Sequence, residues 1–266
     1  MLDPSEFDPA IRQIHERLLT ANEVVFFTGA GASAESGIPT FRDGNNGFWK
    51  HFRPEEVATP EGFAQRPRHV QDWYAERWRF VRNAQPNLAH QTIAELEREC
   101  AGTRFSVLTQ NVDGLHQAAG SRRVLELHGS IHRLRCHAGC GHVADWSAAD
   151  EVHAACPCCQ APRRPDLVWF GEALDPDTFR LAEDAALHAD VFIAIGTSAV
   201  VQPAARLQSL AYKVGALVVE VNPAESALSA QTTFALRSTA GAFFEALERV
   251  RNAPTQPSLG MSPSIS

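Results

Sequence analysis

The chain has 266 residues, a formal net charge of −7 and 44% hydrophobic residues, which indicates one large packed domain or a domain with a small insertion. The negative charge disfavours a surface built for nucleic-acid phosphates, so direct nucleic-acid binding is not expected. The first residues lack the basic start and apolar core of a signal peptide, and no apolar run is long enough to span a bilayer. We therefore expect a cytoplasmic protein without a membrane partner.

Hydrophobic periodicity and capping residues predict alternating helices and strands along the chain. We expect helices over residues 8–21, in short pieces over residues 55–83, from Asn87 to about Cys100, and over residues 239–251. Short apolar runs predict buried strands over residues 24–28, 104–109, 124–127, 191–195 and 217–221. This alternation is typical of an α/β protein with a parallel sheet.

A glycine-rich loop follows the first predicted strand directly. Its sequence, Gly29-Ala30-Gly31-Ala32-Ser33-Ala34, lets main-chain N–H groups approach a phosphate closely, which predicts a nucleotide-phosphate site. The pattern is also compatible with an ordinary strand-to-helix turn. Pro39 and nearby glycines interrupt the helix that a usual dinucleotide-binding unit would have next.

Polar residues follow two further predicted strands. Gln110, Asn111 and Asp113 come after residues 104–109, and His128 comes after residues 124–127. Open α/β sheets bind ligands at the carboxyl ends of their strands, so these side chains are candidates for a site. Asn111 and Asp113 can instead be turn formers and a helix cap, and His128 can be structural. Near such strand ends, a histidine is a candidate general base.

Five of the six cysteines lie between Cys136 and Cys159. In a reducing compartment, clustered cysteines favour a metal site over disulfides. A chance cluster without a metal is the alternative.

Three motifs in this order resemble the sirtuin family of NAD-dependent protein lysine deacylases. They are the loop from Gly29 to Arg42, the run Thr109-Gln110-Asn111-Val112-Asp113-Gly114-Leu115-His116, and His128-Gly129. The resemblance covers roughly residues 10–250, with Val112 in place of the commoner isoleucine. It implies an α/β fold: a Rossmann-like parallel sheet with a small inserted zinc-binding module.

The resemblance also implies a domain division. The NAD-binding domain is expected to comprise residues 1–30, 100–130 and 165–251, and a cofactor-binding loop and helical module to comprise residues 31–99. Residues 131–164 are the expected zinc-binding module. Residues 252–266, rich in proline and serine, are expected to form a disordered tail.

By resemblance, NAD and an acylated-lysine protein substrate would bind in the cleft between the two parts. The residues assigned to NAD are Gly29, Ala30, Gly31, Ser33, Ala34, Ile38, Pro39, Phe41, Arg42, Gln110, Asn111, Val112, Asp113, Gly196, Thr197, Ser198, Asn222, Pro223, Ala224 and Ala240. The catalytic set is His128 as general base, Asn111 holding the ribose or a water, and Asp113 binding the nicotinamide carboxamide.

The resemblance assigns four cysteines to a structural zinc. Cys136 and Cys140 form the first pair, with three residues between them where the family usually has two. For the second pair we choose Cys156 and Cys159, which leaves Cys158 spare. His137 and His142 are possible substitute ligands. Four thiolates leave no open coordination position, so no catalytic part is expected for the metal.

Two segments are assigned to the substrate by the same resemblance. Val168, Phe170, Gly171 and Glu172 lie in a short apolar segment expected to pair with the peptide as an added strand. Tyr74 and Arg77 resemble the residues with which one sirtuin subclass binds succinyl and malonyl groups. Their spacing of three places both on one face of a helix. A surface arginine and a packing tyrosine are the alternative.

These observations predict an NAD-dependent deacylase that prefers succinyl-lysine or malonyl-lysine and acts more weakly on acetyl-lysine. A protein that is mainly a deacetylase, and a mono-ADP-ribosyltransferase on the same fold, remain alternatives. A hydride-transferring oxidoreductase is disfavoured because the acidic ribose-binding residue of the usual dinucleotide unit is missing. A non-catalytic zinc module does not account for His128, Asn111 and Asp113 at strand ends.

Overall fold

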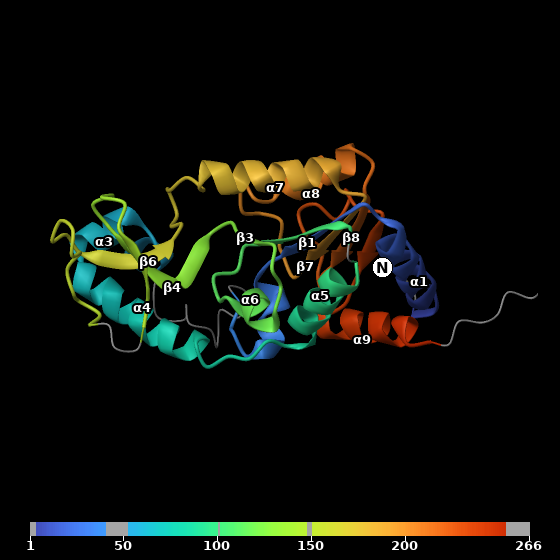
Figure 1. Cartoon of the computed structure of the whole chain (residues 1–266), viewed down its shortest axis with the longest axis horizontal. Coiled ribbons are helices and arrows are strands. Elements are labelled where there is room, and N and C mark those ends of the chain that lie inside the picture. Colours follow the sequence, from blue (N-terminus) through green and yellow to red (C-terminus); the bar gives the residue numbers. More distant parts are fainter. Residues whose placement is uncertain (1–3, 41–52, 101, 148–150, 254–266) are drawn as a thin grey trace, which may run out of the picture.

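The computed structural model describes residues 4–40, 53–100, 102–147 and 151–253. Phe41 and Arg42, and the expected tail from residue 254 onward, lie outside the described residues. The expected α/β fold is confirmed: six parallel strands form one sheet in the order β3-β2-β1-β7-β8-β9 (Figure 1). Its strands are β1 (Glu23–Thr28), β2 (Arg104–Thr109), β3 (Val124–Glu126), β7 (Val191–Ile195), β8 (Leu217–Val221) and β9 (Phe234–Leu236).

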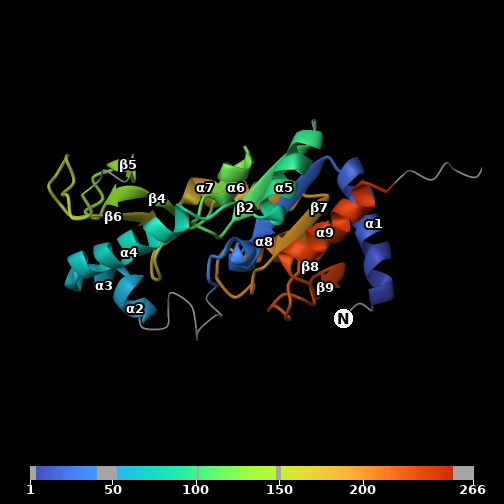
Figure 2. The same cartoon turned by 90° about the horizontal axis from the view of Figure 1, so that it is seen from below.

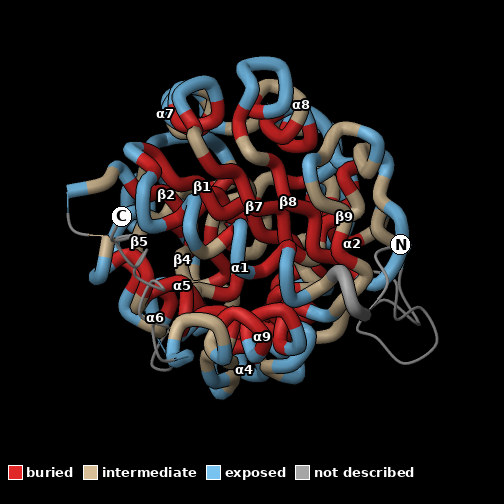
Figure 3. Tube along the Cα trace, turned by 90° about the vertical axis from the view of Figure 1, so that its right-hand side faces the viewer, coloured by how far each residue is buried: buried red, intermediate tan, exposed pale blue. Residues whose placement is uncertain are grey.

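Helices cover both faces of this sheet, as the tube drawing in Figure 3 shows. One face packs against α1 (Pro4–Thr20), α5 (Leu88–Glu99) and α9 (Ala240–Arg251). The other packs against α7 (Pro176–His188) and α8 (Arg206–Lys213). Both faces of β1 are therefore buried, which explains why its sequence is an unbroken apolar run without polar alternation.

A smaller part lies at the end of the molecule opposite α1 (Figures 1 and 2). It contains an antiparallel sheet in the order β5-β4-β6, made of β4 (Gly129–Cys136), β5 (Val143–Asp145) and β6 (Arg163–Leu167). Against it pack α2 (Pro54–Val57), α3 (Pro60–Gln65) and α4 (Pro67–Val81), in a core that includes four tryptophans. Each of these helices begins with a proline, whose fixed φ and missing N–H suit a first helical position.

Residues 168–172, which we expect to pair with a substrate peptide as an added strand, are not part of a strand in this structure. Strand β6 ends at Leu167, and the next residues form a turn in which the Glu172 N–H donates to the Trp169 carbonyl at 3.0 Å. Gly171 has φ +87° there, in the left-handed region that glycine tolerates best.

Among the described residues, no helix is both long enough and apolar enough to cross a membrane.

Candidate active site

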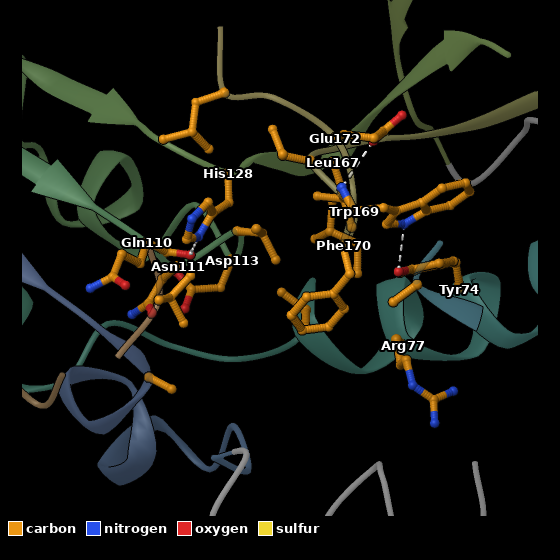
Figure 4. Close-up of a pocket in the computed structure, with 18 of the residues that line it drawn as sticks. Tyr74, Arg77, Gln110, Asn111, Asp113, His128, Leu167, Trp169, Phe170 and Glu172 are labelled. Atoms are coloured by element: carbon orange, nitrogen blue, oxygen red, sulfur yellow. Dashed lines mark hydrogen bonds between the residues drawn. The ribbon is translucent and has the colours of Figure 1, made fainter. Parts of the chain in front are cut away.

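Many of the predicted site residues lie at the carboxyl ends of the strands of the large sheet. Strand β1 lies between β2 and β7, so the strand order reverses at its end, and α/β sheets bind ligands at such a switch point. A cavity of about 350 Å³ opens there and extends to α4 (Figure 4). Its walls include Ala30, Ser33, Ile38, Pro39, Tyr74, Arg77, Gln110, Asn111, Val112, Asp113, His128, Val168, Phe170, Gly171 and Glu172.

Three glycines interlock the loops that follow β1 and β7. The Gly31 N–H donates to the Gly196 carbonyl at 2.9 Å. A Cβ atom on Gly31 would lie 2.6 Å from the Gly196 Cα, and one on Gly29 would lie 2.8 Å from the Gly196 oxygen. The sequence alone attributed the glycines to the approach of a phosphate. The structure adds a second reason, because side chains here would force the two loops apart.

The polar residues after β1 and β2 form one hydrogen-bonded cluster. Asn111 Nδ2 donates to the Gly29 carbonyl and to Ser33 Oγ, each at 3.0 Å. Ser33 Oγ donates in turn to Asp113 Oδ2 at 2.7 Å, while Asp113 Oδ1 accepts from the Leu115 N–H. Asn111 Oδ1 accepts no hydrogen bond from any described residue. The cluster thus fixes both side chains and leaves an oxygen acceptor available to a ligand.

His128 has a defined tautomer. Its Nδ1 lies 3.0 Å from the Gln110 carbonyl oxygen, and because a carbonyl only accepts, Nδ1 carries the hydrogen. Nε2 then holds the lone pair, and it has no hydrogen-bond partner in the described part of the chain. Burial lowers the pKa of His128 below its ordinary value of 6.5, against a smaller opposite effect of the Gln110 bond. The imidazole is therefore neutral at pH 7 and can accept a proton.

The other residues expected to bind NAD lie outside the cavity wall but along the same sheet edge. Gln110 Nε2 donates to Thr197 Oγ1 at 2.9 Å, and Asn222 Nδ2 donates to the Thr197 carbonyl. Further along, Glu35 accepts from the Gly241 N–H at the start of α9. The residues not lining the cavity are Gly29, Gly31, Ala34, Gly196, Thr197, Ser198, Asn222, Pro223, Ala224 and Ala240.

At the far end of the cavity, Tyr74 and Arg77 project from α4 (Figure 4). The Tyr74 hydroxyl accepts a 2.8 Å hydrogen bond from the indole N–H of Trp169. The Arg77 guanidinium lies 3.2 Å from the centre of the Trp73 ring and donates to the Trp73 carbonyl. Burial lowers the pKa of Arg77 to about 10, so the group is charged at pH 7. In this arrangement the guanidinium points away from the Tyr74 hydroxyl (Figure 4).

The sequence did not single out several residues of the cavity wall. They are Ala58, Trp73, Val81, Ile131, Leu167, Trp169, Leu174, Val201, Gln202 and Pro203. Trp169 had a signal, since it lies inside the segment already assigned to the substrate. The others resemble ordinary core or loop residues in sequence.

Four cysteines come together at the tip of the smaller part. The sulfur atoms of Cys136, Cys140, Cys156 and Cys159 lie within 4.8 Å of one another, with their nearest pairs 3.4 and 3.5 Å apart. These separations are too long for disulfides and close to the roughly 3.8 Å expected between thiolates around a tetrahedral zinc. The donor set therefore fits zinc, and Cys158, an exposed free cysteine, is outside it.

Comparison with known proteins identifies the family. Residues 29–203 match the Sir2 family. The "NAD-dependent protein deacylase 1" of Archaeoglobus fulgidus is 47% identical over 233 residues, which cover 86% of this chain and 94% of that protein. The chain belongs to the Sir2 family. Another relative, the "NAD-dependent protein deacylase 1" of Pseudomonas aeruginosa, is 48% identical over 222 residues, 80% of this chain and 88% of that protein.

Solved structures agree with this assignment to the Sir2 family. A Sir2 homolog–NAD complex superimposes with a TM-score of 0.83 at 45% identity, covering 90% of this chain and 93% of that one. A mutant Sir2 homologue in complex with ADP-ribose gives the same TM-score at 44% identity, covering 90% of this chain and 96% of that one.

Proposed function

We propose that this Sir2 protein is an NAD-dependent protein lysine deacylase that removes succinyl or malonyl groups in preference to acetyl groups. The observation that carries the proposal is the single cavity that joins the neutral imidazole of His128 to the phenol and guanidinium of Tyr74 and Arg77. The activity is also the one in the names of the relatives from Archaeoglobus fulgidus and Pseudomonas aeruginosa. The products would be the free lysine, nicotinamide and O-acyl-ADP-ribose.

NAD fits the wall formed by the β1 loop and the residues after β2. When bound, it supplies the ribose carbon that takes the acyl oxygen as nicotinamide departs. The residues that would hold NAD are the separate positions assigned to it from the sequence, of which Gly29 is the first and Ala240 the last. Phe41, expected to shield the reacting face from water, and Arg42, expected to order the loop, belong to this proposal from sequence alone.

His128 would act as the general base through its Nε2 atom. The Gln110 carbonyl holds the hydrogen on Nδ1, so the lone pair on Nε2 is available to take a proton from a ribose hydroxyl. Asn111 Oδ1 would accept a hydrogen bond from the ribose or a water. Asp113 would bind the nicotinamide carboxamide, since each carboxylate oxygen retains a lone pair beside its present bond.

The acyl preference rests on the charge at the α4 end of the cavity. Arg77 is 7% exposed and Tyr74 is 5% exposed, so a carboxylate bound there would be shielded from water. A guanidinium and a phenol together offer that carboxylate charge-assisted hydrogen bonds, each worth roughly 1.5–3 kcal/mol. To reach that carboxylate, the Arg77 guanidinium would have to turn from the Trp73 ring toward the cavity. An acetyl group would make none of these bonds.

The peptide itself would lie across Val168, Phe170, Gly171 and Glu172. The Phe170 ring is 53% exposed at the cavity rim, where it is available to a substrate backbone or side chain. Most main-chain N–H groups of this turn already donate within the chain, but among the described residues nothing donates to the Val168 and Phe170 carbonyl oxygens, which an extended peptide could therefore use. An acylated-lysine protein is the partner implied by this geometry.

Zinc would have a structural role in this proposal. Four thiolates complete its tetrahedral shell and fasten β4 to the loop that precedes β6. We also propose the division into an NAD-binding domain (residues 1–30, 100–130 and 165–251), a loop and helical module (residues 31–99) and a zinc-binding module (residues 131–164). The shared core of α2, α3, α4, β4 and β6 supports grouping the last two around one small core.

The experiment is an assay of one peptide carrying succinyl-, malonyl- or acetyl-lysine, with products identified by mass spectrometry. The proposal expects NAD-dependent loss of the acyl group, fastest for the acidic groups. Arg77→Met should reduce the ratio of desuccinylation to deacetylation at least about tenfold. Gain of ADP-ribose by the peptide would favour the transferase alternative. Faster removal of acetyl by the wild type would refute the acyl preference but leave the deacylase activity.

A further inference from the structure

Trp169 lies beside Tyr74 at the α4 end of the cavity, where the acyl group is proposed to bind. It has no role in the function described above. Its side chain is 3% exposed and its ring stacks on the Tyr74 ring, with 6.0 Å between centroids and 22° between planes. Its indole N–H donates to the Tyr74 oxygen at 2.8 Å (Figure 4). Both groups line the cavity, so this bond lies beside any acyl group that enters.

The direction of this hydrogen bond decides what Tyr74 can offer a ligand. An indole N–H is a donor only, whereas a phenol has one hydrogen to donate and lone pairs to accept with. The Trp169 bond therefore occupies a lone pair of the Tyr74 oxygen and leaves the hydroxyl hydrogen unused. Among the described residues, none accepts that hydrogen. Burial raises the pKa of Tyr74, so the hydroxyl remains protonated at neutral pH.

Trp169 is itself held from two directions. The Arg164 guanidinium carbon lies 3.8 Å from the centre of its ring, on a side chain that is 1% exposed. Glu172 accepts a hydrogen bond from Arg164 with one oxygen and from the Trp169 backbone N–H, at 2.9 Å, with the other. Arg164, Glu172 and Trp169 thus form a support, with Arg164 and Trp169 buried and Glu172 half-buried, that fixes where the indole N–H points. A residue that served only to fill space would not need this orientation.

We propose that Trp169 is a specificity-determining positioning residue, which turns the Tyr74 hydroxyl into a hydrogen-bond donor aimed at the terminal carboxylate of an acidic acyl group. A hydrogen bond received by the phenol also strengthens the one that it donates. This inference rests on the proposed acyl preference and adds the element that orients the phenol. It assigns Arg164 and Glu172 to the support of the indole.

The test measures equilibrium binding of one peptide carrying succinyl-lysine or acetyl-lysine, by calorimetry and without NAD. In Trp169→Phe the ring is kept and the N–H is lost, and we expect the ratio of acetyl to succinyl dissociation constants to fall about tenfold. Tyr74→Phe should lower the ratio by a similar factor. The double variant should lower it no further than Tyr74→Phe alone, because both changes remove the same bond to the ligand.

Trp78→Phe is the matched control. Trp78 lies on the same helix as Tyr74 and in the same small core, but its indole N–H has no hydrogen-bond partner among the described residues. Its substitution should leave the ratio within twofold of wild type. Thermal unfolding of each variant verifies that it is folded at the temperature of the titration.

The outcomes separate this inference from the function on which it rests. A wild-type protein that binds both peptides equally would refute the acyl preference, and the role of Trp169 with it. A wild-type preference that persists in Trp169→Phe but is lost in Tyr74→Phe would refute the role of Trp169 alone. If Trp169→Phe weakens the binding of both peptides by the same factor, the indole serves only in packing.

Discussion

The tautomer of His128 connects one hydrogen bond to the chemistry of the site. The Gln110 carbonyl that holds Nδ1–H belongs to the residue directly after β2, so the strand pairing that builds the sheet also orients the imidazole. Burial keeps the ring neutral by lowering its pKa. A half-buried imidazole with a fixed tautomer and an available Nε2 lone pair is suited to accept a proton rather than to bind a phosphate.

Substitution of this base should affect turnover more than NAD binding. His128→Ala is expected to lower deacylation at least about a hundredfold, the usual scale for loss of a general base. NAD affinity, measured by calorimetry, should change little. His188→Ala, which removes an exposed histidine of α7, is the matched control and should retain normal turnover. Near-normal deacylation in His128→Ala would eliminate this residue as the base.

The pH profile gives an independent test of the same residue. Because the pKa of His128 is lowered, its neutral form persists below pH 6.5 and is lost only in more acid solution. The acid limb of the wild-type kcat/KM profile should therefore have its midpoint below pH 6.5. A midpoint above that value would contradict the lowered pKa of His128. The residual activity of His128→Ala should lack this limb.

The N-terminus of α5 ties a helix to the cofactor loop. Asn87 Oδ1 accepts from the Ala89 and His90 N–H groups, and its Nδ2 donates to the Ala32 carbonyl at 2.8 Å. Asn87→Ala should lower the free energy of unfolding by about 1–2 kcal/mol, as for other lost caps, and should also weaken NAD binding. Urea unfolding and calorimetry measure the two effects.

Asp175→Ala provides the comparison for that prediction. Asp175 caps α7 by accepting from the Thr178 N–H, and among the described residues it has no bond to the cofactor loop. Its substitution should reduce stability but preserve NAD affinity. Equal loss of NAD affinity in both variants would mean that the Asn87–Ala32 bond does not shape the loop.

The four-cysteine cluster joins strand β4 to the segment before β6. Metal analysis should find one zinc per chain, and Cys136→Ser or Cys159→Ser should remove it and lower the melting temperature, because metal binding at such a site contributes to folding. Cys158→Ser, one position from a ligand, is the control and should retain the metal. Loss of zinc in Cys158→Ser together with its retention in Cys159→Ser would reverse the ligand choice.

Elements with a local signal could be predicted from the sequence. Strand β1 is marked by its unbroken apolar run, and the starts of α5 and α4 are marked by Asn87 and Pro67. Each of these signals has a physical cause within its own short segment. The apolar residues between 168 and 172 face a cavity and a small core rather than a sheet. No short-range pattern distinguishes these environments, since burial in either one selects the same side chains.

The site was predictable where motif residues lie at strand ends, and not where distant segments meet. Asn111, Asp113 and His128 line the cavity as expected. The bond from Trp169 to Tyr74 joins residues 95 positions apart, so only the packing of the β6 turn against α4 brings them together. The need for glycine at position 31 is likewise set by a distant segment. A side chain there would clash with the Gly196 turn, which follows β7.

At the scale of the whole molecule, a buried histidine of α6 (Leu115–Ala119) contacts the end of β1 beneath the site. His116 is 1% exposed. The Thr28 hydroxyl donates its one hydrogen to Thr109 Oγ1. Toward His116 Nε2, which lies 2.9 Å away, the Thr28 oxygen is therefore the acceptor, and Nε2 carries a hydrogen. Nδ1 therefore carries the lone pair, and it has no partner among the described residues. Protonation would place a charge and an unsatisfied donor in the core, and burial lowers the pKa of His116 to about 3.

This histidine should make the fold sensitive to acid. Between pH 6.5 and about 3 the unfolded chain binds a proton at His116 that the folded chain does not, so the free energy of unfolding falls as pH decreases, by up to roughly 1.4 kcal/mol per pH unit. His116→Gln, although less stable at pH 7, should lose less stability between pH 7 and pH 5 in urea unfolding. His188→Gln should retain the wild-type slope. The same slope in His116→Gln would show that other groups cause the acid sensitivity.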